Sequence, residues 1–327
     1  MIFDCVRCGI LLASILATSL LPQHAQAKNE YPTRPIRLIV PVSAGGGLDT
    51  TTRAVAQKLT QAWGQQVIVD NRPGASGVLA FDLAIKAAPD GHTLLMMSAD
   101  HVINSAPSAK RPYDITRDVT AISQATALSY LVYSNPSVPF TTFKDLIAYG
   151  RAHPGKLNYG TPGTGSLQHL GWEVLSQMGG TKFSHVPYKG GAPAIVATIA
   201  GDVQIGFITL TSARPHLQSG RARALAVTSN ERMRAMPDLP TVAEAGLPGY
   251  ELNQYYGAVI TAKAPPAIIS KLANGITAAV RSPDVIQRFE ADGWRLVGST
   301  PDEFRTVIRN DLDKWTKVIK DNGLVIN

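Results

Sequence analysis

The 327-residue chain is 45% hydrophobic and 17% charged, which is ordinary for a globular protein, and its formal net charge is +7. Its two cysteines, Cys5 and Cys8, both lie within the first ten residues, which excludes a disulfide framework or a cysteine-ligated metal in the rest of the chain. The lysines and arginines are scattered, without a basic run or a base-stacking motif, so no nucleic-acid partner is expected. The positive charge indicates either a mildly basic surface or attraction of anionic ligands.

The first 27 residues are predicted to be an export signal. Arg7 precedes an apolar run over residues 9–21, which is too short to span a bilayer as a helix. Ala25-Gln26-Ala27 then provides the small-x-small pattern of a signal-peptidase site. We expect cleavage near Ala27, which leaves 300 exported residues, enough for two domains or one large one. A retained membrane anchor is the alternative.

Short apolar runs alternate with amphipathic stretches over the next seventy residues. The predicted strands are Ile36–Val42, Val67–Val69 and Thr93–Met97, and the predicted helices are Asp49–Trp63, with Asp49 as N-cap, and Val78–Ala88. This β-α-β-α-β order predicts a parallel sheet with helices on both faces.

A second set of elements begins near residue 120. Strands are predicted at Leu131–Tyr133, Leu157–Gly160, Phe183–Val186 and Val203–Ile208, and helices at Phe143–His153, Ser166–Met178 and Pro193–Ala200. Ala222–Thr228 is predicted to be a strand that returns to the first lobe, and helices follow at Pro266–Arg281, Pro283–Asp292 and Pro301–Asn322. The pattern predicts two α/β lobes with a ligand cleft between them. The first lobe comprises residues 28–125 and 226–327, and the second comprises residues 126–225.

The glycine-rich segment Ser43–Asp49 lies between a predicted strand and a predicted helix. Its glycines let the backbone turn and present N–H groups, and the N-terminus of the following helix favours an anion. A dinucleotide site is the rival interpretation, but Gly45-Gly46-Gly47-Leu48-Asp49-Thr50 lacks the G-x-G-x-x-G spacing. A purely structural turn is the other alternative.

A second such loop, Gly160–Ser166, also joins a strand to a helix. It has the spacing G-x-x-x-x-G, but Ser166-Leu167 follows where a P-loop has lysine and a hydroxyl residue. Two loops at the carboxyl ends of strands in separate lobes would face each other across a cleft. The pair therefore predicts one anion-binding site.

Catalytic motifs are missing from the sequence. Gly74-Ala75-Ser76-Gly77-Val78 has valine where a nucleophile elbow has its second glycine. The sequence has no H-E-x-x-H motif, and its histidines show no metal-ligand spacing. We therefore expect a binding protein without a cofactor or a metal, and not an enzyme.

Ordered sequence blocks run along the whole chain after the predicted signal. They are Tyr31–Pro41 followed by glycines and Asp49, Asp70–Ala75, Pro89–Leu95, Pro154–Gly160, His185–Gly190, Arg223–Ser229, Pro237–Thr241, Glu244–Glu251 and Lys314-Trp315. These blocks resemble the Bug receptors, the TctC-type solute-binding components of tripartite tricarboxylate transporters.

The resemblance implies a two-lobed type II periplasmic-binding-protein fold, in which each lobe is a mixed, mainly parallel sheet flanked by helices. It implies a monomer that captures a small carboxylate (di-, tri- or aromatic) and passes it to integral-membrane transporter subunits. The carboxylate would lie between the first-lobe and second-lobe loops. The ligand-binding residues expected on matching positions are Ser43, Ala44, Gly45, Gly46, Asp49, Ser98, Thr161, Thr164, Gly165, Ser166, His169, Tyr188 and Thr209.

Two departures from the family pattern bear on the ligand. The first loop has Ser43-Ala44 where the family usually has Ala-Pro or Ala-Ala. After Phe207, Ile208-Thr209 stand where many relatives carry an aspartate, one candidate to hold an ammonium group. The resemblance therefore favours a ligand without an amino group. A ligand-presenting subunit for a membrane kinase and an exported hydrolase are the alternative functions.

Overall fold

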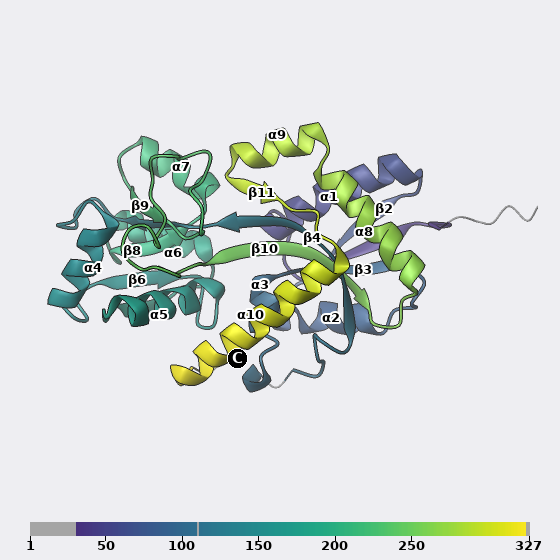
Figure 1. Cartoon of the computed structure of the whole chain (residues 1–327), viewed down its shortest axis with the longest axis horizontal. Coiled ribbons are helices and arrows are strands. Elements are labelled where there is room, and N and C mark those ends of the chain that lie inside the picture. Colours follow the sequence, from purple (N-terminus) through teal and green to yellow (C-terminus); the bar gives the residue numbers. More distant parts are fainter. Residues whose placement is uncertain (1–30, 110, 325–327) are drawn as a thin grey trace, which may run out of the picture. The chain divides into compact units, whose positions relative to one another are not determined.

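The computed structural model describes residues 31–109 and 111–324 (Figure 1), so the predicted export signal lies outside the described residues. In chain order the elements are β1 (Ile36–Val40), α1 (Gly47–Trp63), β2 (Val67–Asn71), η1 (Ala75–Gly77), α2 (Val78–Ile85), β3 (Thr93–Ser98), α3 (Ala99–Ile103), η2 (Pro107–Ala109), β4 (Val119–Ser129), β5 (Leu131–Ser134), α4 (Phe143–Ala152), β6 (Asn158–Thr161), α5 (Leu167–Gly179), β7 (Ser184–Pro187), α6 (Gly191–Ala200), β8 (Ile205–Ile208), α7 (Leu210–Gln218), β9 (Arg223–Val227), β10 (Asn253–Thr261), α8 (Pro266–Val280), α9 (Pro283–Ala291), β11 (Trp294–Leu296) and α10 (Pro301–Asp321). Within this part of the chain no helix combines the length and the apolar character needed to cross a membrane.

The described strands form two mixed sheets, one in each lobe. The first has six strands in the order β11-β4-β10-β3-β1-β2, and the second has five in the order β7-β6-β8-β5-β9. Parallel pairing is confined to β2-β1-β3 and β7-β6-β8. The other pairs are antiparallel, and they include β4 and β10, which lead into and out of the second lobe in opposite directions. The sheets are therefore less parallel than expected. Figure 1 shows the long antiparallel pair β4 and β10 reaching from the first sheet toward the second.

The two crossings between the sheets are hydrogen-bonded to each other. Tyr130 is the single residue between β4 and β5, and Thr228 follows β9. The Tyr130 N–H donates to Thr228 Oγ1 (2.8 Å), and the Thr228 N–H donates to the Tyr130 carbonyl (2.9 Å). The Thr228 hydroxyl also donates to the Leu252 carbonyl (2.7 Å), just before β10 begins. This buried joint connects the lobes through three segments that are distant in sequence.

Several predicted elements need correction. Asp49 is not the N-cap of α1, because the helix begins at Gly47 with Gly46 as its cap. Strand β9 stays in the second sheet, where it pairs with β5, and does not return to the first lobe. Strands β4, β10 and β11 and helices α3 and α7 were not predicted. Strand β4 combines alanine with serine and threonine, and most of it is buried, so it lacks the polar–apolar alternation of a half-exposed strand.

Helices with strong caps match their predicted bounds closely. Helix α10 begins at Pro301, where the Thr300 hydroxyl accepts a bond from the Glu303 N–H and the Glu303 carboxylate accepts one from the Thr300 N–H. In the core, Trp172 of α5 is fully buried and stacks on Phe207, with ring centroids 4.5 Å apart. This packing anchors α5, and therefore the loop before it, to the second sheet.

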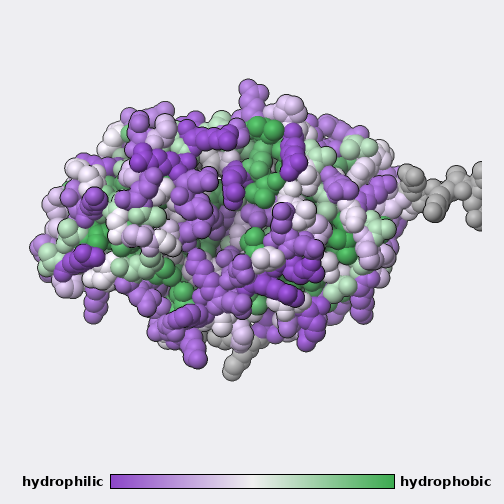
Figure 2. Space-filling model, viewed as in Figure 1, coloured by the Kyte–Doolittle hydropathy of each residue, from purple (hydrophilic) through white to green (hydrophobic). Residues whose placement is uncertain are grey.

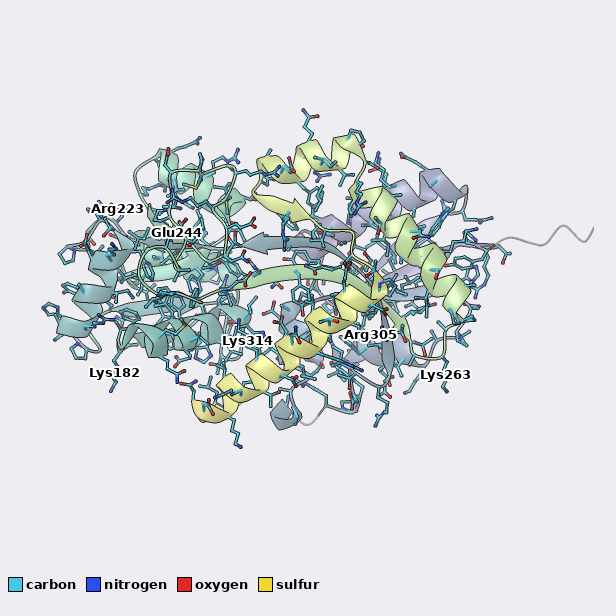
Figure 3. The ribbon with its side chains drawn as sticks, viewed as in Figure 1. Lys182, Arg223, Glu244, Lys263, Arg305 and Lys314 are labelled. Atoms are coloured by element: carbon cyan, nitrogen blue, oxygen red, sulfur yellow. The ribbon has the colours of Figure 1, made fainter. Side chains whose placement is uncertain are left out.

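The surface is polar, and its charge is spread over both lobes. The face in Figure 2 is mostly hydrophilic, and its apolar residues form separate patches. The basic residues Lys182, Arg223, Lys263 and Arg305, labelled in Figure 3, belong to different segments of the two lobes. These four basic residues are therefore not gathered in one place.

Candidate functional site

A cavity of about 350 Å³ lies between the two lobes. The first lobe contributes the segment after β1, the loop over residues 74–77 and the turn that begins at Ser98 after β3. The second lobe contributes Pro162, Ser166 and Gln168, and Tyr130 lies at the crossing. The carboxyl ends of β1, β3 and β6 thus meet at this cavity, which is where α/β sheets commonly bind ligands.

The predicted first-lobe loop is exposed and continues the cavity wall. Pro41 and Val42 line the cavity, and Ser43, Ala44, Gly45 and Gly46 follow as exposed residues. The cavity-lining residues do not include these four. Their role in ligand binding therefore stays a prediction.

The Asp49 side chain fixes this loop through hydrogen bonds. Its buried carboxylate accepts bonds from the Gly45 N–H (3.0 Å), from Arg53 Nε (2.8 Å) and from Asn71 Nδ2 (2.9 Å). Burial raises the pKa of Asp49, but the bonds from Arg53, Gly45 and Asn71 outweigh it and hold the pKa below its usual value. Asp49 is therefore an anion that fixes the loop from inside the protein.

Ser98 and His101 form a compact turn on the cavity wall. The Ser98 N–H donates to His101 Nδ1 (3.1 Å), and the Ser98 hydroxyl lies 2.8 Å from the same nitrogen. Because Nδ1 accepts the N–H bond, the ring proton of the neutral imidazole resides on Nε2. Burial lowers the pKa of His101 to about 4, against the opposing effect of the Asp100 charge. His101 is therefore a neutral donor at neutral pH.

The lowered pKa of His101 predicts a loss of stability in mild acid. The unfolded chain takes up a proton below pH 6.5, whereas the folded protein resists protonation until about pH 4. The free energy of unfolding should therefore fall as the pH drops through this window, by about 2 kcal/mol at pH 5 from this residue. Urea denaturation at pH 7 and pH 5 measures the change.

His101→Asn should lose less stability between these pH values than the wild type, because an amide oxygen can accept the Ser98 N–H without titrating. His153→Asn, at an exposed position, is the control and should keep the wild-type pH dependence. An unchanged pH dependence in His101→Asn would contradict the assignment.

The loop beside His101 has an unusual backbone. Gly74, Ala75, Ser76 and Gly77 have successive positive φ angles of 119°, 48°, 51° and 91°. Such angles are costly for Ala75 and Ser76, and strain of this kind gathers at functional sites. Ser76 lines the cavity.

The amides of the predicted second-lobe loop are largely occupied by acceptors of the chain itself. The N–H groups of Gly163, Gly165, Leu167 and His169 donate, in that order, to Thr161 Oγ1 (3.3 Å), His169 Nδ1 (3.1 Å), Asp100 Oδ1 (3.0 Å) and Ser166 Oγ (3.2 Å). Ser166 is the N-cap of α5 and lines the cavity, and Thr164 is exposed. This loop therefore has fewer open donors than its sequence suggests.

His169 belongs to a stack of aromatic rings, and Thr161 contacts one ring of that stack. The rings of His169 and His185 are stacked with centroids 3.9 Å apart, and Thr161 Oγ1 lies 2.6 Å from His185 Nε2. Burial lowers the pKa of His169, and burial followed by the neighbouring His169 lowers that of His185 to about 4. Through these contacts both histidines hold the loop over residues 160–166 in place.

The remaining predicted residues lie at the ends of second-lobe strands and do not line the cavity. The Tyr188 N–H donates to the Thr161 carbonyl (3.0 Å) just after β7. Thr209 caps α7 by accepting a bond from the Ser212 N–H (3.4 Å). Among the predicted site residues, Ser98 and Ser166 are the two that line the cavity.

Residues that the sequence did not indicate complete the cavity wall. Asp100, His101 and Asn104 follow Ser98 in the same turn, and Tyr130 and Gln168 face them from the crossing and from α5. A cluster of polar residues after a strand end was the available signal for the first three. Among the described residues that line the cavity there is no lysine or arginine. The described part of the chain also has no group of three or more His, Cys, Asp and Glu side chains placed to hold a metal ion.

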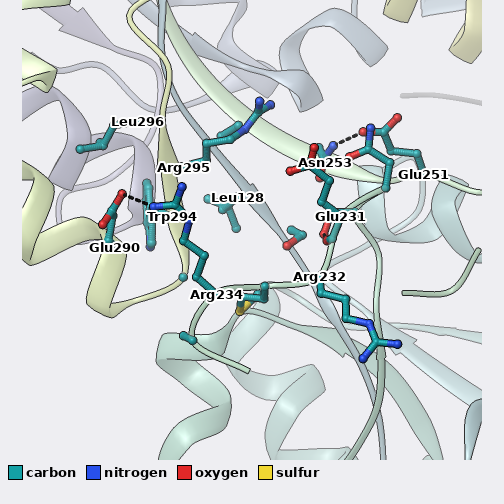
Figure 4. Close-up of a pocket in the computed structure, with 17 residues that line it drawn as sticks. Leu128, Glu231, Arg232, Arg234, Glu251, Asn253, Glu290, Trp294, Arg295 and Leu296 are labelled. Atoms are coloured by element: carbon teal, nitrogen blue, oxygen red, sulfur yellow. Dashed lines mark hydrogen bonds and ion pairs between the residues drawn. The ribbon is translucent and has the colours of Figure 1, made fainter. Parts of the chain in front are cut away.

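A second cavity of about 340 Å³ lies between the loop over residues 229–235 and β11 (Figure 4). Arg234 pairs there with Glu290 (3.5 Å), and Arg232 pairs with Glu244 (2.9 Å). Arg234 is 91% exposed, and none of the predicted site residues lines this cavity. The cavity between the lobes is therefore the candidate site.

Two α/β lobes, joined by a narrow crossing and enclosing a cavity, define the solute-binding receptors of the periplasmic-binding-protein class. The chain belongs to the tripartite tricarboxylate transporter family receptors (TctC), whose model matches residues 51–324. It is 33% identical to the protein BugT of Bordetella pertussis over 300 residues, covering 90% of both chains. These matches confirm the family and the fold predicted from the sequence blocks. Members of this family are solute-binding receptors and not enzymes.

Two solved structures are also similar over most of the chain. The R. palustris protein Rpa4515 with adipate has a TM-score of 0.79 and 32% identity, covering 90% of this chain and 99% of that one. MatC (Rpa3494) from Rhodopseudomonas palustris with bound malate has a TM-score of 0.75 and 28% identity, covering 88% of this chain and 100% of that one.

Proposed function

We propose that this chain is exported to the periplasm, captures a small carboxylate between its lobes, and presents it as a monomer to the membrane subunits of a tripartite transporter. The observation that carries the proposal is the cavity of about 350 Å³ where strand ends of both lobes meet. The relatives with adipate and malate support a carboxylate as the ligand.

Neutral donors would hold the carboxylate, because no cationic side chain lines the described cavity. The His101 Nε2–H, the Ser76 and Tyr130 hydroxyls and the amides at the N-terminus of α1 are the proposed donors. The predicted residues Ser43–Gly46, Thr161–Ser166, Tyr188 and Thr209 would approach the ligand as the lobes close.

Closure would turn on the two crossings. Tyr130 and Thr228 lie near the proposed lobe boundaries at residues 125/126 and 225/226. A ligand that contacts both lobes favours the closed form by its higher affinity for that form. Removal of the export signal near Ala27 is part of the same proposal.

The test is binding of carboxylates by the mature protein. Adipate, malate, hexanoate and benzoate should be screened by thermal shift, and each acid that raises the melting temperature should be titrated by calorimetry. We expect at least one to bind with a Kd of roughly micromolar, as a few charge-assisted hydrogen bonds allow after ordering costs. Stabilisation by amino acids alone, or by no carboxylate, would contradict the proposal.

Ser166→Ala locates the binding in the cavity. The change removes a hydroxyl that lines the cavity and donates to the Gly163 carbonyl (2.8 Å), which loosens the second-lobe loop, and it should weaken binding about fivefold. It also removes the N-cap of α5, at about 1 kcal/mol. Thr142→Ala removes the corresponding cap of α4 at similar cost, away from the cavity, and should leave the Kd unchanged. Equal Kd values for both variants would mean that Ser166 is not part of the site.

A further inference from the structure

The carboxylate of Asp100 links the two lobes across the cavity. Asp100 belongs to α3 in the first lobe, and its Oδ1 accepts a bond from the Leu167 N–H (3.0 Å) at the start of α5 in the second lobe. Its Oδ2 accepts a bond from Gln254 Nε2 (2.6 Å) on β10. Asp100 also lines the cavity.

Gln254 fixes the direction of this network. Its Oε1 accepts bonds from the backbone N–H groups of Ala99 (3.1 Å) and Tyr255 (3.0 Å). The amide must therefore turn its Nε2 toward Asp100, where it can only donate. Both carboxylate oxygens of Asp100 thus accept bonds from fixed donors.

Asp100 occupies the helix end where a ligand carboxylate would otherwise bind. The positive end of α5 favours one negative charge, and the chain itself supplies that charge to the Leu167 amide. The nearby Gly165 and His169 amides already donate to His169 Nδ1 and Ser166 Oγ. This end of the cavity therefore has little left to offer a second carboxylate.

The charge of Asp100 also acts on two nearby tyrosines. The pKa of Tyr130 and that of Tyr256 are raised, mainly by burial and further by the charge of Asp100. Tyr130 is buried and Tyr256 is half-buried, and no lysine or arginine lines the described cavity to compensate for another anion.

We propose that Asp100 is a specificity-determining residue that excludes a second carboxylate from the second-lobe end of the cavity, so that the preferred ligand carries one carboxylate and a neutral far end. This inference rests on the proposed function and narrows it to monocarboxylates. A second ligand carboxylate would face the Asp100 carboxylate in a partly enclosed cavity, where the two like charges repel each other. A ligand with a neutral far end avoids this repulsion.

The experiment compares acids that differ by one carboxylate at equal carbon number. The pairs are hexanoate with adipate and butyrate with succinate, titrated by calorimetry into the mature protein. We expect the wild type to bind the monocarboxylate of at least one pair tenfold or more tighter than its dicarboxylate. Asp100→Asn keeps an oxygen that can accept the Leu167 N–H but removes the charge, and should shift this ratio at least tenfold toward the dicarboxylate.

Controls separate specificity from structure. Asp145→Asn removes the same charge from the exposed first turn of α4, away from the cavity, and should leave the ratio unchanged. Asp100→Ser, neutral and shorter, should shift the ratio in the same direction as Asp100→Asn, and melting curves identify the folded variants. Binding of both acids with the same ratio in the wild type and the neutral variants overturns the inference and leaves the proposed function standing. No binding of any of the four acids to the wild type or its variants overturns the inference, and it overturns the proposed function as well when malate and benzoate also fail to bind.

Discussion

Replacing Gly77 by alanine is expected to lower the free energy of unfolding by about 2–4 kcal/mol and to abolish ligand binding. Gly77 has a φ of +91°, where a residue with a Cβ is strained. The added Cβ would lie 2.6 Å from Cδ2 and 3.0 Å from Nε2 of His101. The ring cannot simply move aside, because Nδ1 is held by the Ser98 N–H and hydroxyl. The clash therefore either unfolds this part of the lobe or displaces a proposed ligand donor.

Gly220→Ala is the matched control for this prediction. Gly220 also has a positive φ, +67°, but its Cβ would meet nothing within 4 Å. It should cost about 1–2 kcal/mol from backbone strain alone and leave binding intact. Chemical denaturation gives both stabilities, and calorimetry gives both Kd values. Equal costs at the two positions would show that the packing of Gly77 against His101 contributes nothing.

The elements that could be predicted from the sequence are those whose bounds are set by residues close to them in the chain. Helices α5 and α10 begin where Ser166 and Thr300 can cap them, and both caps are local in sequence. Strands β4 and β10 depend instead on each other: Val119 pairs with Thr261 and Ser129 with Asn253, across more than a hundred residues. No local pattern marks such a pairing, which explains why these two strands were not predicted.

The candidate site likewise has residues that the sequence predicts and residues that it does not. Ser98 ends β3 and Ser166 lies in the loop after β6, and the rule that ligands bind at the carboxyl ends of strands places both at the cavity. Asp100 acquires its position only when α5 approaches α3, since its partner Leu167 is 67 residues away. The sequence shows two loops rich in backbone donors. It does not show that carboxylates of the chain itself already accept bonds from these donors. The Asp49 carboxylate accepts one backbone N–H of the first loop, and the Asp100 carboxylate accepts the Leu167 N–H directly after the second loop.

Asp49→Ala is expected to lower the free energy of unfolding at pH 7 by about 2–4 kcal/mol and to weaken ligand binding at least tenfold. The side chain is 3% exposed, and its removal leaves the Gly45 amide and Asn71 Nδ2 without their acceptor and Arg53 without its ion pair. The loop over residues 43–46 then loses the bond that holds its backbone against α1.

The pH dependence of this effect distinguishes the Asp49 carboxylate from the packing of its side chain. Its folded pKa lies below the usual value of 3.8, so its stabilising effect is complete above that value and is lost as the pH falls through the folded pKa. The difference in stability between wild type and Asp49→Ala should therefore shrink below about pH 4. Urea denaturation at pH 7, 5 and 3.5 measures it.

Asp82→Ala provides the comparison, because Asp82 also pairs with a cation one helical turn away but is 50% exposed. Its effect should stay below about 0.5 kcal/mol, as for other surface ion pairs. The ligand titration tests whether Asp49 also contributes to binding. A folded Asp49→Ala protein that binds its carboxylate as tightly as the wild type would show that the loop over residues 43–46 does not hold the ligand. The binding surface would then consist of the loop over residues 74–77, the turn over residues 98–104, Tyr130 and the second-lobe wall.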